Sequence, residues 1–231
     1  MKYLTPNWPA PKHIKAYTTL RSSWGASASD HTDEPSMQRL QALLNLPDKP
    51  IWLTQTHSTT VIEATPENNG NEADASFTYQ PNRVCVVQTA DCLPLLICNK
   101  QGTYVAAIHA GWRGLAGGII EATLKNAPHP LNDLVIWLGP AIGPEKFEVG
   151  LDVYDAFIRE HPASRAAFTP SAEGKWLANL YALARARLSD LGITEIYGGD
   201  FCTYSQQDLF FSYRHDKSKT GRMASLIWIA D

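Results

Sequence analysis

Continuous apolar runs, each bounded by polar or turn-forming residues, dominate the middle and the end of this chain. Runs of about four to eight apolar residues are typical of strands that are buried on both faces. They predict strands at residues 51–55, 60–64, 84–88, 93–98, 103–108, 134–138 and 223–229. Because the predicted strands outnumber the predicted helices, we expect much of the sheet to be antiparallel.

Three further segments carry apolar residues at helical spacing and predict helices at residues 115–125, 152–161 and 176–191. The last of these ends before Gly192, a residue type that commonly stops a helix. We expect these helices to cover the sheet, so the sequence predicts an α/β fold built in layers. The chain has no repeats and no low-complexity tract, and we expect one domain over residues 1–231.

Composition supports a large core, since 44% of the 231 residues are apolar and seven are Trp. The formal charge of −3 lacks the basic excess that neutralises nucleic-acid phosphates. Residues 1–11 are interrupted by Pro6 and Pro9 and are unlike a signal peptide, and no run of about 18 apolar residues occurs. We therefore expect a cytoplasmic protein that binds neither nucleic acid nor membranes, and no protein partner is indicated.

The chain has four cysteines, too few for a disulfide scaffold and without the paired spacing of a zinc knuckle. Cys85 and Cys98 lie inside predicted strands, where a thiol usually serves as a small buried hydrophobe. Cys92 differs because it follows an acid and starts a strand. It is therefore the cysteine whose position favours chemistry.

A predicted hairpin places Cys92 beside a histidine. Residues 99–102, which end in glycine, connect two apolar runs and are typical of a hairpin loop. In such a pair the start of one strand faces the end of the next, so Cys92 and His109 should be neighbours. His57 also follows a predicted strand, 51–55, and should lie at a sheet edge.

Two hypotheses use these side chains. Two imidazoles and a thiolate, with a fourth position left open, are the ligand set of a catalytic zinc site, which His57, Cys92 and His109 would form. Without a metal, Cys92 would be a nucleophile with His109 as its base, oriented by Asp91 or another acid. The first hypothesis needs His57, whereas the second gives it no role. The residues by themselves leave both hypotheses open.

Several arginines are candidates for binding an anion. Arg113 precedes a glycine-containing predicted helix, where a guanidinium suits a phosphate group. Arg214 and Arg222 flank a polar loop before the last predicted strand. A surface or ion-paired arginine is the alternative in each case, and Arg21 and Asp74 are similarly ambiguous.

Taken together, short motifs from about Pro6 to Ile229 resemble the YfiH family. The motifs are Thr-Gln-Thr-His at 54–57, Ala-Asp-Ala-Ser at 73–76, Gln-Thr-Ala-Asp-Cys-Leu-Pro at 88–94, His-Ala-Gly-Trp-Arg-Gly at 109–114, Leu-Gly-Pro-Ala-Ile-Gly at 138–143, Phe-Glu-Val-Gly at 147–150, Cys-Thr-Tyr-Ser at 202–205, and Phe-Phe-Ser-Tyr-Arg with Gly-Arg-Met-Ala-Ser within 210–225. Members of that family have been called polyphenol oxidases or laccase-domain proteins, and they are regarded as purine nucleoside phosphorylases with adenosine deaminase activity. The chain departs from the family at Ser58, where glycine is usual, and over residues 22–33.

The resemblance implies a layered α/β sandwich with a mixed, largely antiparallel sheet, as in certain cysteine-hydrolase toxins. It implies zinc held by His57, Cys92 and His109, with copper as the alternative metal. The implied substrates are phosphate and purine nucleosides such as adenosine, inosine and methylthioadenosine, which would yield the free base and a ribose 1-phosphate.

The two implied reactions give roles to the remaining candidates. Phosphorolysis needs phosphate beside the anomeric carbon and stabilisation of the leaving purine, which makes Arg113 a catalytic candidate. Arg21, Arg214 and Arg222 are the substrate-binding candidates. Deamination needs an activated water beside the purine C6 atom, and Asp91 is the catalytic candidate for proton transfer or for orienting a ligand. The competing functions are a Cys-His hydrolase of amide bonds, including the editing of cell-wall precursors, and a copper-dependent phenol oxidase.

Overall fold

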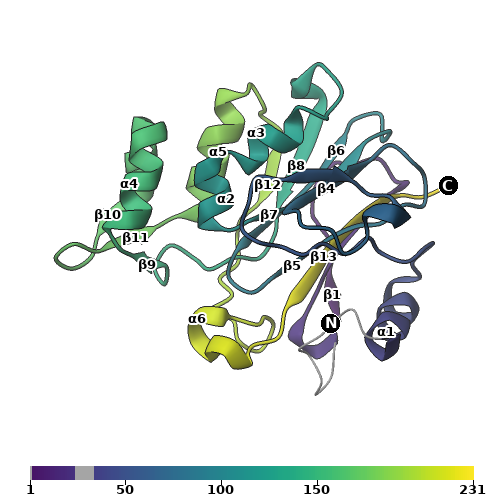
Figure 1. The fold of residues 1–231 in the computed structure, drawn as a ribbon, viewed down its shortest axis with the longest axis horizontal. Helices are drawn as coiled ribbons and strands as arrows, with labels where there is room; N and C mark the ends of the chain where they lie inside the picture. Colours follow the sequence, from purple (N-terminus) through teal and green to yellow (C-terminus); the bar gives the residue numbers. More distant parts are fainter. Residues whose placement is uncertain (1, 24–33) are drawn as a thin grey trace.

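The computed structural model describes residues 2–23 and 34–231, and two β-sheets form its centre (Figure 1). The larger sheet has six strands in the order β12-β8-β6-β7-β4-β3. Its strands are β3 (Val61–Glu63), β4 (Ala75–Thr78), β6 (Leu93–Asn99), β7 (Val105–Ala110), β8 (Leu134–Leu138) and β12 (Ile196–Gly198). Two neighbouring pairs, β3 with β4 and β8 with β12, are parallel, and the others are antiparallel.

The second sheet is antiparallel throughout and has four strands in the order β1-β2-β13-β5. Its strands are β1 (Tyr3–Leu4), β2 (Ile14–Thr19), β5 (Cys85–Thr89) and β13 (Met223–Ile229). A third, short sheet combines β9 (Glu148–Val149), β10 (Phe168–Pro170) and β11 (Trp176–Ala178), and it lies with α4 at the left of Figure 1. The predicted α/β fold, layered with mixed and largely antiparallel sheets, is confirmed.

α-Helices cover the outer faces of the two large sheets and also lie beside the short third sheet (Figure 1). Their bounds are α1 (Glu34–Leu44), α2 (Trp112–Gly117), α3 (Ile119–Leu124), α4 (Leu151–Glu160), α5 (Leu180–Asp190) and α6 (Tyr213–Asp216). Short 3-10 turns occur at η1 (Arg21–Ser23), η2 (Pro66–Asn68), η3 (Leu131–Asp133), η4 (Pro162–Ala167) and η5 (Lys217–Lys219). Side chains of α2, α3 and α5 pack with the six-stranded sheet, whereas Leu40 and Leu44 of α1 pack with the four-stranded sheet. The molecule is therefore a sandwich of helices, sheet, sheet and helix.

The central strand β6 explains why the sequence pattern is continuous rather than alternating. Successive residues of a strand point to opposite faces. Leu95 and Ile97 pack against the helices, whereas Leu96 and Cys98 pack against the four-stranded sheet. Because both faces are covered, every position of β6 is apolar or buried.

The predicted hairpin between β6 and β7 is confirmed. The side-chain carbonyl of Asn99 accepts hydrogen bonds from the backbone N–H groups of Thr103 and Tyr104, which closes the loop. In the resulting register Pro94 lies opposite His109. The beginning of β6 and the end of β7 therefore lie at one edge of the sheet.

The prediction of a helix over residues 176–191 was wrong for its first residues. Trp176–Ala178 forms β11, which pairs with both β9 and β10. The helix starts only after Asn179, whose side chain accepts a hydrogen bond from the backbone N–H of Ala182. Two pairing strands and an N-cap, a residue that satisfies the first helical N–H groups, therefore outweigh the local spacing.

Two other element predictions need correction. The predicted helix at residues 115–125 is two helices, because Gly118 between them adopts the left-handed conformation with φ 94°. The predicted strand at residues 51–55 forms only isolated bridges, at Ile51 and Thr54. The structure also contains short strands that the pattern did not predict, among them β4, which pairs with residues 105–108 of β7.

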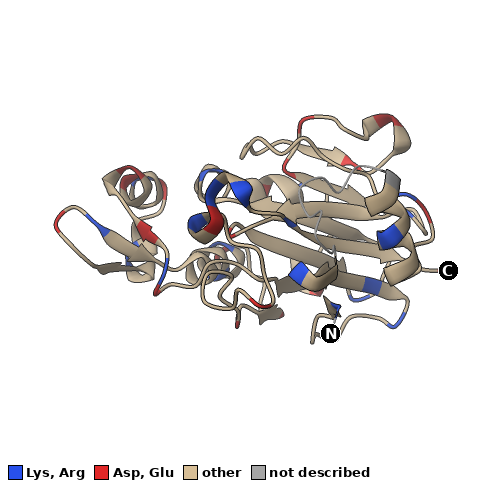
Figure 2. Ribbon diagram, turned by 90° about the horizontal axis from the view of Figure 1, so that it is seen from below, with Lys and Arg blue, Asp and Glu red and all other residues tan. Residues whose placement is uncertain are grey.

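Charge is close to balanced, with 20 Lys and Arg against 23 Asp and Glu. Figure 2 shows basic and acidic residues close together among the helices in the middle of the view. Within residues 2–23 and 34–231, the structure contains no helix with the length and apolarity that a membrane crossing requires.

We predict that Leu96→Ala lowers the free energy of unfolding by about 2 to 5 kcal/mol, because it opens a cavity between the two sheets where Leu96 is fully buried. Leu151→Ala is the matched control, since Leu151 is 55% exposed and should change stability by less than about 0.5 kcal/mol. Denaturant unfolding measures both values. Equal effects from the two variants would contradict the described packing.

Candidate metal centre and its cavity

The structure brings together the three side chains that were predicted to form a site. The possible ligand atoms of His57, Cys92 and His109 all lie within 4.8 Å of one another. Cys92 Sγ is 3.7 Å from His57 Nε2, and the two imidazole rings meet edge to face with centroids 4.8 Å apart. The sequence predicted that these three side chains, which are far apart along the chain, lie close together, and the structure confirms this.

The chain passes from the four-stranded to the six-stranded sheet between β5 and β6, and Cys92 lies in that connection. His109 is near the end of β7, on the strand face that Val105 and Ala107 turn toward the other sheet. The candidate site therefore lies at one edge of the space between the two sheets.

Asp74 fixes the positions of both histidines. Its carboxylate is fully buried, and Oδ1 lies 2.7 Å from Nδ1 of His109. The same carboxylate accepts hydrogen bonds from the backbone N–H groups of Thr56, His57 and Ser58 and from the Ser58 hydroxyl. His57 has φ 62°, an uncommon value for a residue other than glycine, and these bonds stabilise it.

Gly111 allows the next segment to pass close to the site. A Cβ atom at this position would lie 2.5 Å from His57 Cδ2 and 3.2 Å from Cys92 Sγ. The contact with His57 is too short for a Cβ atom unless the imidazole moves, and the contact with Cys92 is tight. Glycine is therefore required where β7 leads into α2.

Hydrogen bonds dominate the electrostatics of this cluster. Burial opposes ionisation of Asp74, but hydrogen bonds from His109 and Ser58 outweigh it and lower the pKa of Asp74 to about 2. Burial also opposes a charge on His109, but Asp74 and Cys92 raise its pKa to about 9. Likewise, burial disfavours the Cys92 thiolate, yet hydrogen bonds from His109 and His57 lower its pKa to about 6. These hydrogen bonds therefore favour the thiolate form of Cys92.

The donor set fits a metal ion. An imidazole whose Nδ1 is held by a buried carboxylate presents Nε2 as a ligand, which is the usual arrangement behind a metal-bound histidine. Two imidazoles with a low-pKa thiolate suit zinc or copper. Among the described residues, this is the one group of three or more metal-ligating side chains that lie close together.

The cluster opens into a cavity of about 600 Å³. Its lining residues are Gln55, His57, Gln88, Thr89, Ala90, Asp91, Cys92, His109, Trp112, Ile142, Phe147, Leu180, Tyr213, Arg214 and Arg222. The lining combines an apolar and aromatic part with two arginines. A volume of this size is typical of small-molecule sites.

The structure separates the four candidate arginines. Arg214 and Arg222 line the cavity. Arg113 is exposed, its guanidinium stacks 4.2 Å from the Trp112 ring centroid, and it is not among the lining residues. Arg21 also lies outside the lining and pairs with Asp216 at 2.9 Å. Direct roles for Arg113 and Arg21 stay predictions.

Asp91 lines the cavity, but its carboxylate is occupied. It accepts hydrogen bonds from the hydroxyls of Thr203 and Ser212 and from the backbone N–H of Arg214. None of these three donors belongs to His57, Cys92 or His109, the proposed metal ligands. The expected role of Asp91 in proton transfer stays a prediction.

Sequence reasoning left Asp74 ambiguous and did not single out Gln55. The Gln55 side chain donates to the carbonyl of Gln88 and accepts from its N–H, so it ties the segment before His57 to β5. The position of Gln55 two residues before a candidate ligand was the available signal.

Comparisons with known proteins identify the relatives of the chain as a whole. A family model described as a multi-copper polyphenol oxidoreductase laccase matches residues 16–230. A purine nucleoside phosphorylase of Haemophilus influenzae is 47% identical, with 99% of each chain covered. The purine nucleoside phosphorylase YfiH of Escherichia coli (strain K12) is 46% identical over the same shares.

Solved structures share the fold. A Neisseria meningitidis protein of the DUF152 family is 42% identical and superposes with a TM-score of 0.91 over the whole of both chains. YlmD from Geobacillus stearothermophilus is 25% identical with a TM-score of 0.89, covering 100% of this chain and 97% of that one. With the motifs, the fold and the full-length identity in agreement, the chain belongs to the YfiH family, whose model carries the multi-copper polyphenol oxidoreductase laccase description.

Proposed function

We propose that this chain is a zinc-dependent purine nucleoside phosphorylase that also deaminates adenosine. One observation carries the proposal: a single cavity combines the donor set of His57, Cys92 and His109 with two arginines and an apolar lining. Relatives that are 46% and 47% identical over almost their whole length bear the name purine nucleoside phosphorylase. The proposed substrates are phosphate with adenosine, inosine or methylthioadenosine.

In phosphorolysis, a phosphate oxygen forms a bond to C1′ of the sugar while the bond from C1′ to the purine nitrogen breaks, and the purine takes up a proton. Arg214 and Arg222 would hold the phosphate, since guanidinium groups bind its oxygens with paired N–H donors. Trp112 and Phe147 would pack against the flat base.

A bound zinc ion, held by His57, Cys92 and His109, would act as a Lewis acid toward the substrate and would make water more acidic for the replacement of the adenine amino group. Asp74 would keep both imidazoles in place for this purpose. The apolar part of the cavity lining would lower the local dielectric once a substrate fills the cavity, which would strengthen the charge interactions there.

A Cys-His hydrolase is the second candidate, and a specific contact favours it. Asp74 holds Nδ1 of His109, and hydrogen bonds from His109 and His57 lower the pKa of Cys92, which is the order of acid, base and nucleophile in a covalent mechanism. Phenol oxidation is suggested only by the family description, although two histidines and a cysteine also serve copper. Elemental analysis separates these candidates, because the proposal requires one zinc per chain.

We predict that His57→Ala lowers phosphate-dependent release of the base from adenosine by about a hundredfold or more, because one ligand of the metal is lost. Bound zinc should fall in parallel, as measured by elemental analysis after dialysis. His129→Ala is the matched control at an exposed histidine outside the cavity. Full activity of His57→Ala, or release of base that does not depend on phosphate, would contradict the proposal.

We predict that Arg222→Gln raises KM for phosphate by about tenfold or more, since a charge-assisted hydrogen bond contributes about 1.5 to 3 kcal/mol. KM for the nucleoside should change much less. Arg113→Gln makes the same chemical change at the exposed arginine outside the lining. Steady-state assays with phosphate varied at saturating nucleoside compare the two variants. An equal rise in KM for phosphate in the two variants would contradict the prediction, because Arg113 would then also contact the phosphate.

We predict that iodoacetamide alkylates Cys92 of the metal-free protein at a rate that rises through pH 6 and then levels off, because the pKa of the thiol is lowered to about 6. Burial raises the pKa of Cys85 and Cys98 to about 12, so both serve as internal controls that stay unmodified. Peptide mass spectrometry measures each site. Zinc loading should protect Cys92, whereas rapid alkylation of the active zinc-loaded protein would support the hydrolase.

A further inference from the structure

The short helix α6 carries two residues of the cavity wall, Tyr213 and Arg214. A helix of four residues is too short to be stable by its own hydrogen bonds. Its conformation must therefore depend on contacts from other segments. Two carboxylates, one at each end, supply such contacts.

Asp91 acts at the beginning of α6. Its Oδ2 accepts the backbone N–H of Arg214 at 2.6 Å, and it also lies 3.1 Å from the hydroxyl of Ser212. Ser212 is itself the N-cap, and its hydroxyl accepts the N–H of His215. Asp91 therefore binds the first-turn N–H that the N-cap leaves without a partner, and a negative charge is favourable at this end of a helix.

The other oxygen of Asp91 ties α6 to a third segment. Oδ1 accepts the hydroxyl of Thr203 at 2.6 Å, and Thr203 is fully buried. The backbone carbonyl of Asp91 also accepts the N–H of Ile142, another residue of the cavity lining. Asp91 has φ 87°, an uncommon conformation for a residue with a side chain, and its hydrogen bonds hold it there.

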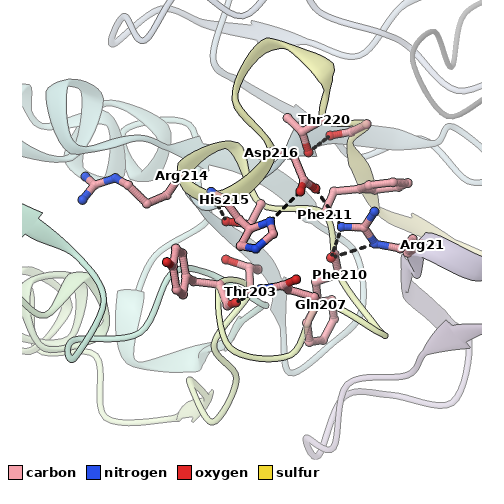
Figure 3. Close-up of polar contacts among 12 residues, drawn as sticks. Arg21, Thr203, Gln207, Phe210, Phe211, Arg214, His215, Asp216 and Thr220 are labelled. Atoms are coloured by element: carbon pink, nitrogen blue, oxygen red, sulfur yellow. Dashed lines mark hydrogen bonds and ion pairs between the residues drawn. The ribbon is translucent and has the colours of Figure 1, made fainter.

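The Arg21–Asp216 ion pair acts at the end of α6 (Figure 3). Asp216 also contacts Nδ1 of His215 at 2.6 Å. Arg21 donates to the carbonyl of Phe210 and stacks over the ring of Phe211, so it anchors the chain that leads into α6. Figure 3 shows Arg214 extending away from this pair.

Arg214 completes the connection to the cavity. One N–H of its guanidinium donates to the carbonyl of Glu148, and the group lies 5.5 Å from the ring centroid of Phe147. Among the residues that the structure describes, that carbonyl is the guanidinium's one hydrogen-bond partner, and a guanidinium has further N–H donors that a ligand could use. A shift of the α6 backbone would move this guanidinium relative to the donor set of His57, Cys92 and His109.

We infer that Asp91 is a positioning residue: through the Arg214 amide and the hydroxyls of Ser212 and Thr203, it holds α6 so that Arg214 can bind the phosphate. The Arg21–Asp216 pair anchors the opposite end of the same helix. This role rests on the proposed phosphorolysis and differs from both roles expected from the sequence, proton transfer and the orientation of a metal ligand. It also gives Arg21 an indirect part in substrate binding.

The test compares Asp91→Asn with Asp208→Asn, the same change at an exposed carboxylate of a neighbouring loop. In Asp91→Asn, KM for phosphate should rise by about tenfold or more, while kcat, the KM for the nucleoside and bound zinc change little. Amide exchange at Arg214 should be faster by a similar factor. Asp208→Asn should leave all of these values unchanged. Thr203→Val removes a single donor and should give a smaller effect in the same direction, which guards against a folding defect of Asp91→Asn.

Unchanged exchange at the Arg214 amide in Asp91→Asn would overturn the inference. A fall in kcat with an altered pH profile and an unchanged KM for phosphate would also overturn the inference, because it would indicate proton transfer by Asp91. Loss of zinc from Asp91→Asn would overturn it as well, because it would assign Asp91 to the metal centre. If the unmodified protein has no phosphate-dependent activity, the proposed function fails, but exchange at the Arg214 amide still decides whether Asp91 holds α6.

Discussion

A single buried carboxylate, Asp74, holds the candidate centre together. It binds the ring of His109 and three consecutive backbone N–H groups around His57, so one acceptor holds an imidazole and the backbone that carries the second imidazole. A buried carboxylate without these donors would be strongly unfavourable, and the histidines without it would lose their orientation. The Ser58 hydroxyl donates to the same carboxylate and adds a further hydrogen bond to this interaction.

The location of the centre follows from the sandwich. Two sheets packed face to face leave a boundary where the chain must cross from one to the other, and Cys92 lies in such a crossing. A polar group in the middle of a strand that is buried on both faces needs a partner nearby, whereas Cys92 and His109 lie near strand ends, where the cavity reaches them. Glycine at position 111 lets the chain turn past them without filling the space.

The same three atoms suit several chemistries. A thiolate beside two imidazoles can bind zinc, bind copper or act as a nucleophile, and the family description and the names of the relatives point in different directions. The surrounding cavity supports the proposed phosphorolysis, because Arg214 and Arg222 could bind an anion and the aromatic lining could pack against a flat base.

Much of the fold could be predicted because periodic apolar patterns report burial within one segment. The strands at 93–98 and 134–138 and the hairpin after residue 98 were evident in this way, and they placed Cys92 beside His109. Long-range contacts were not evident. No local pattern shows that Asp74 binds His109 and the loop around His57. Nor does one show that Arg214 and Arg222 line the cavity while Arg113 does not, or that residues 176–178 form a paired strand.

The sequence by itself determined which segments are buried and which residues have reactive chemistry, because both depend on residue type and spacing. Only the tertiary structure decided which of those residues meet, because hydrogen-bond partners are set by segments that become neighbours only after the sheets have packed.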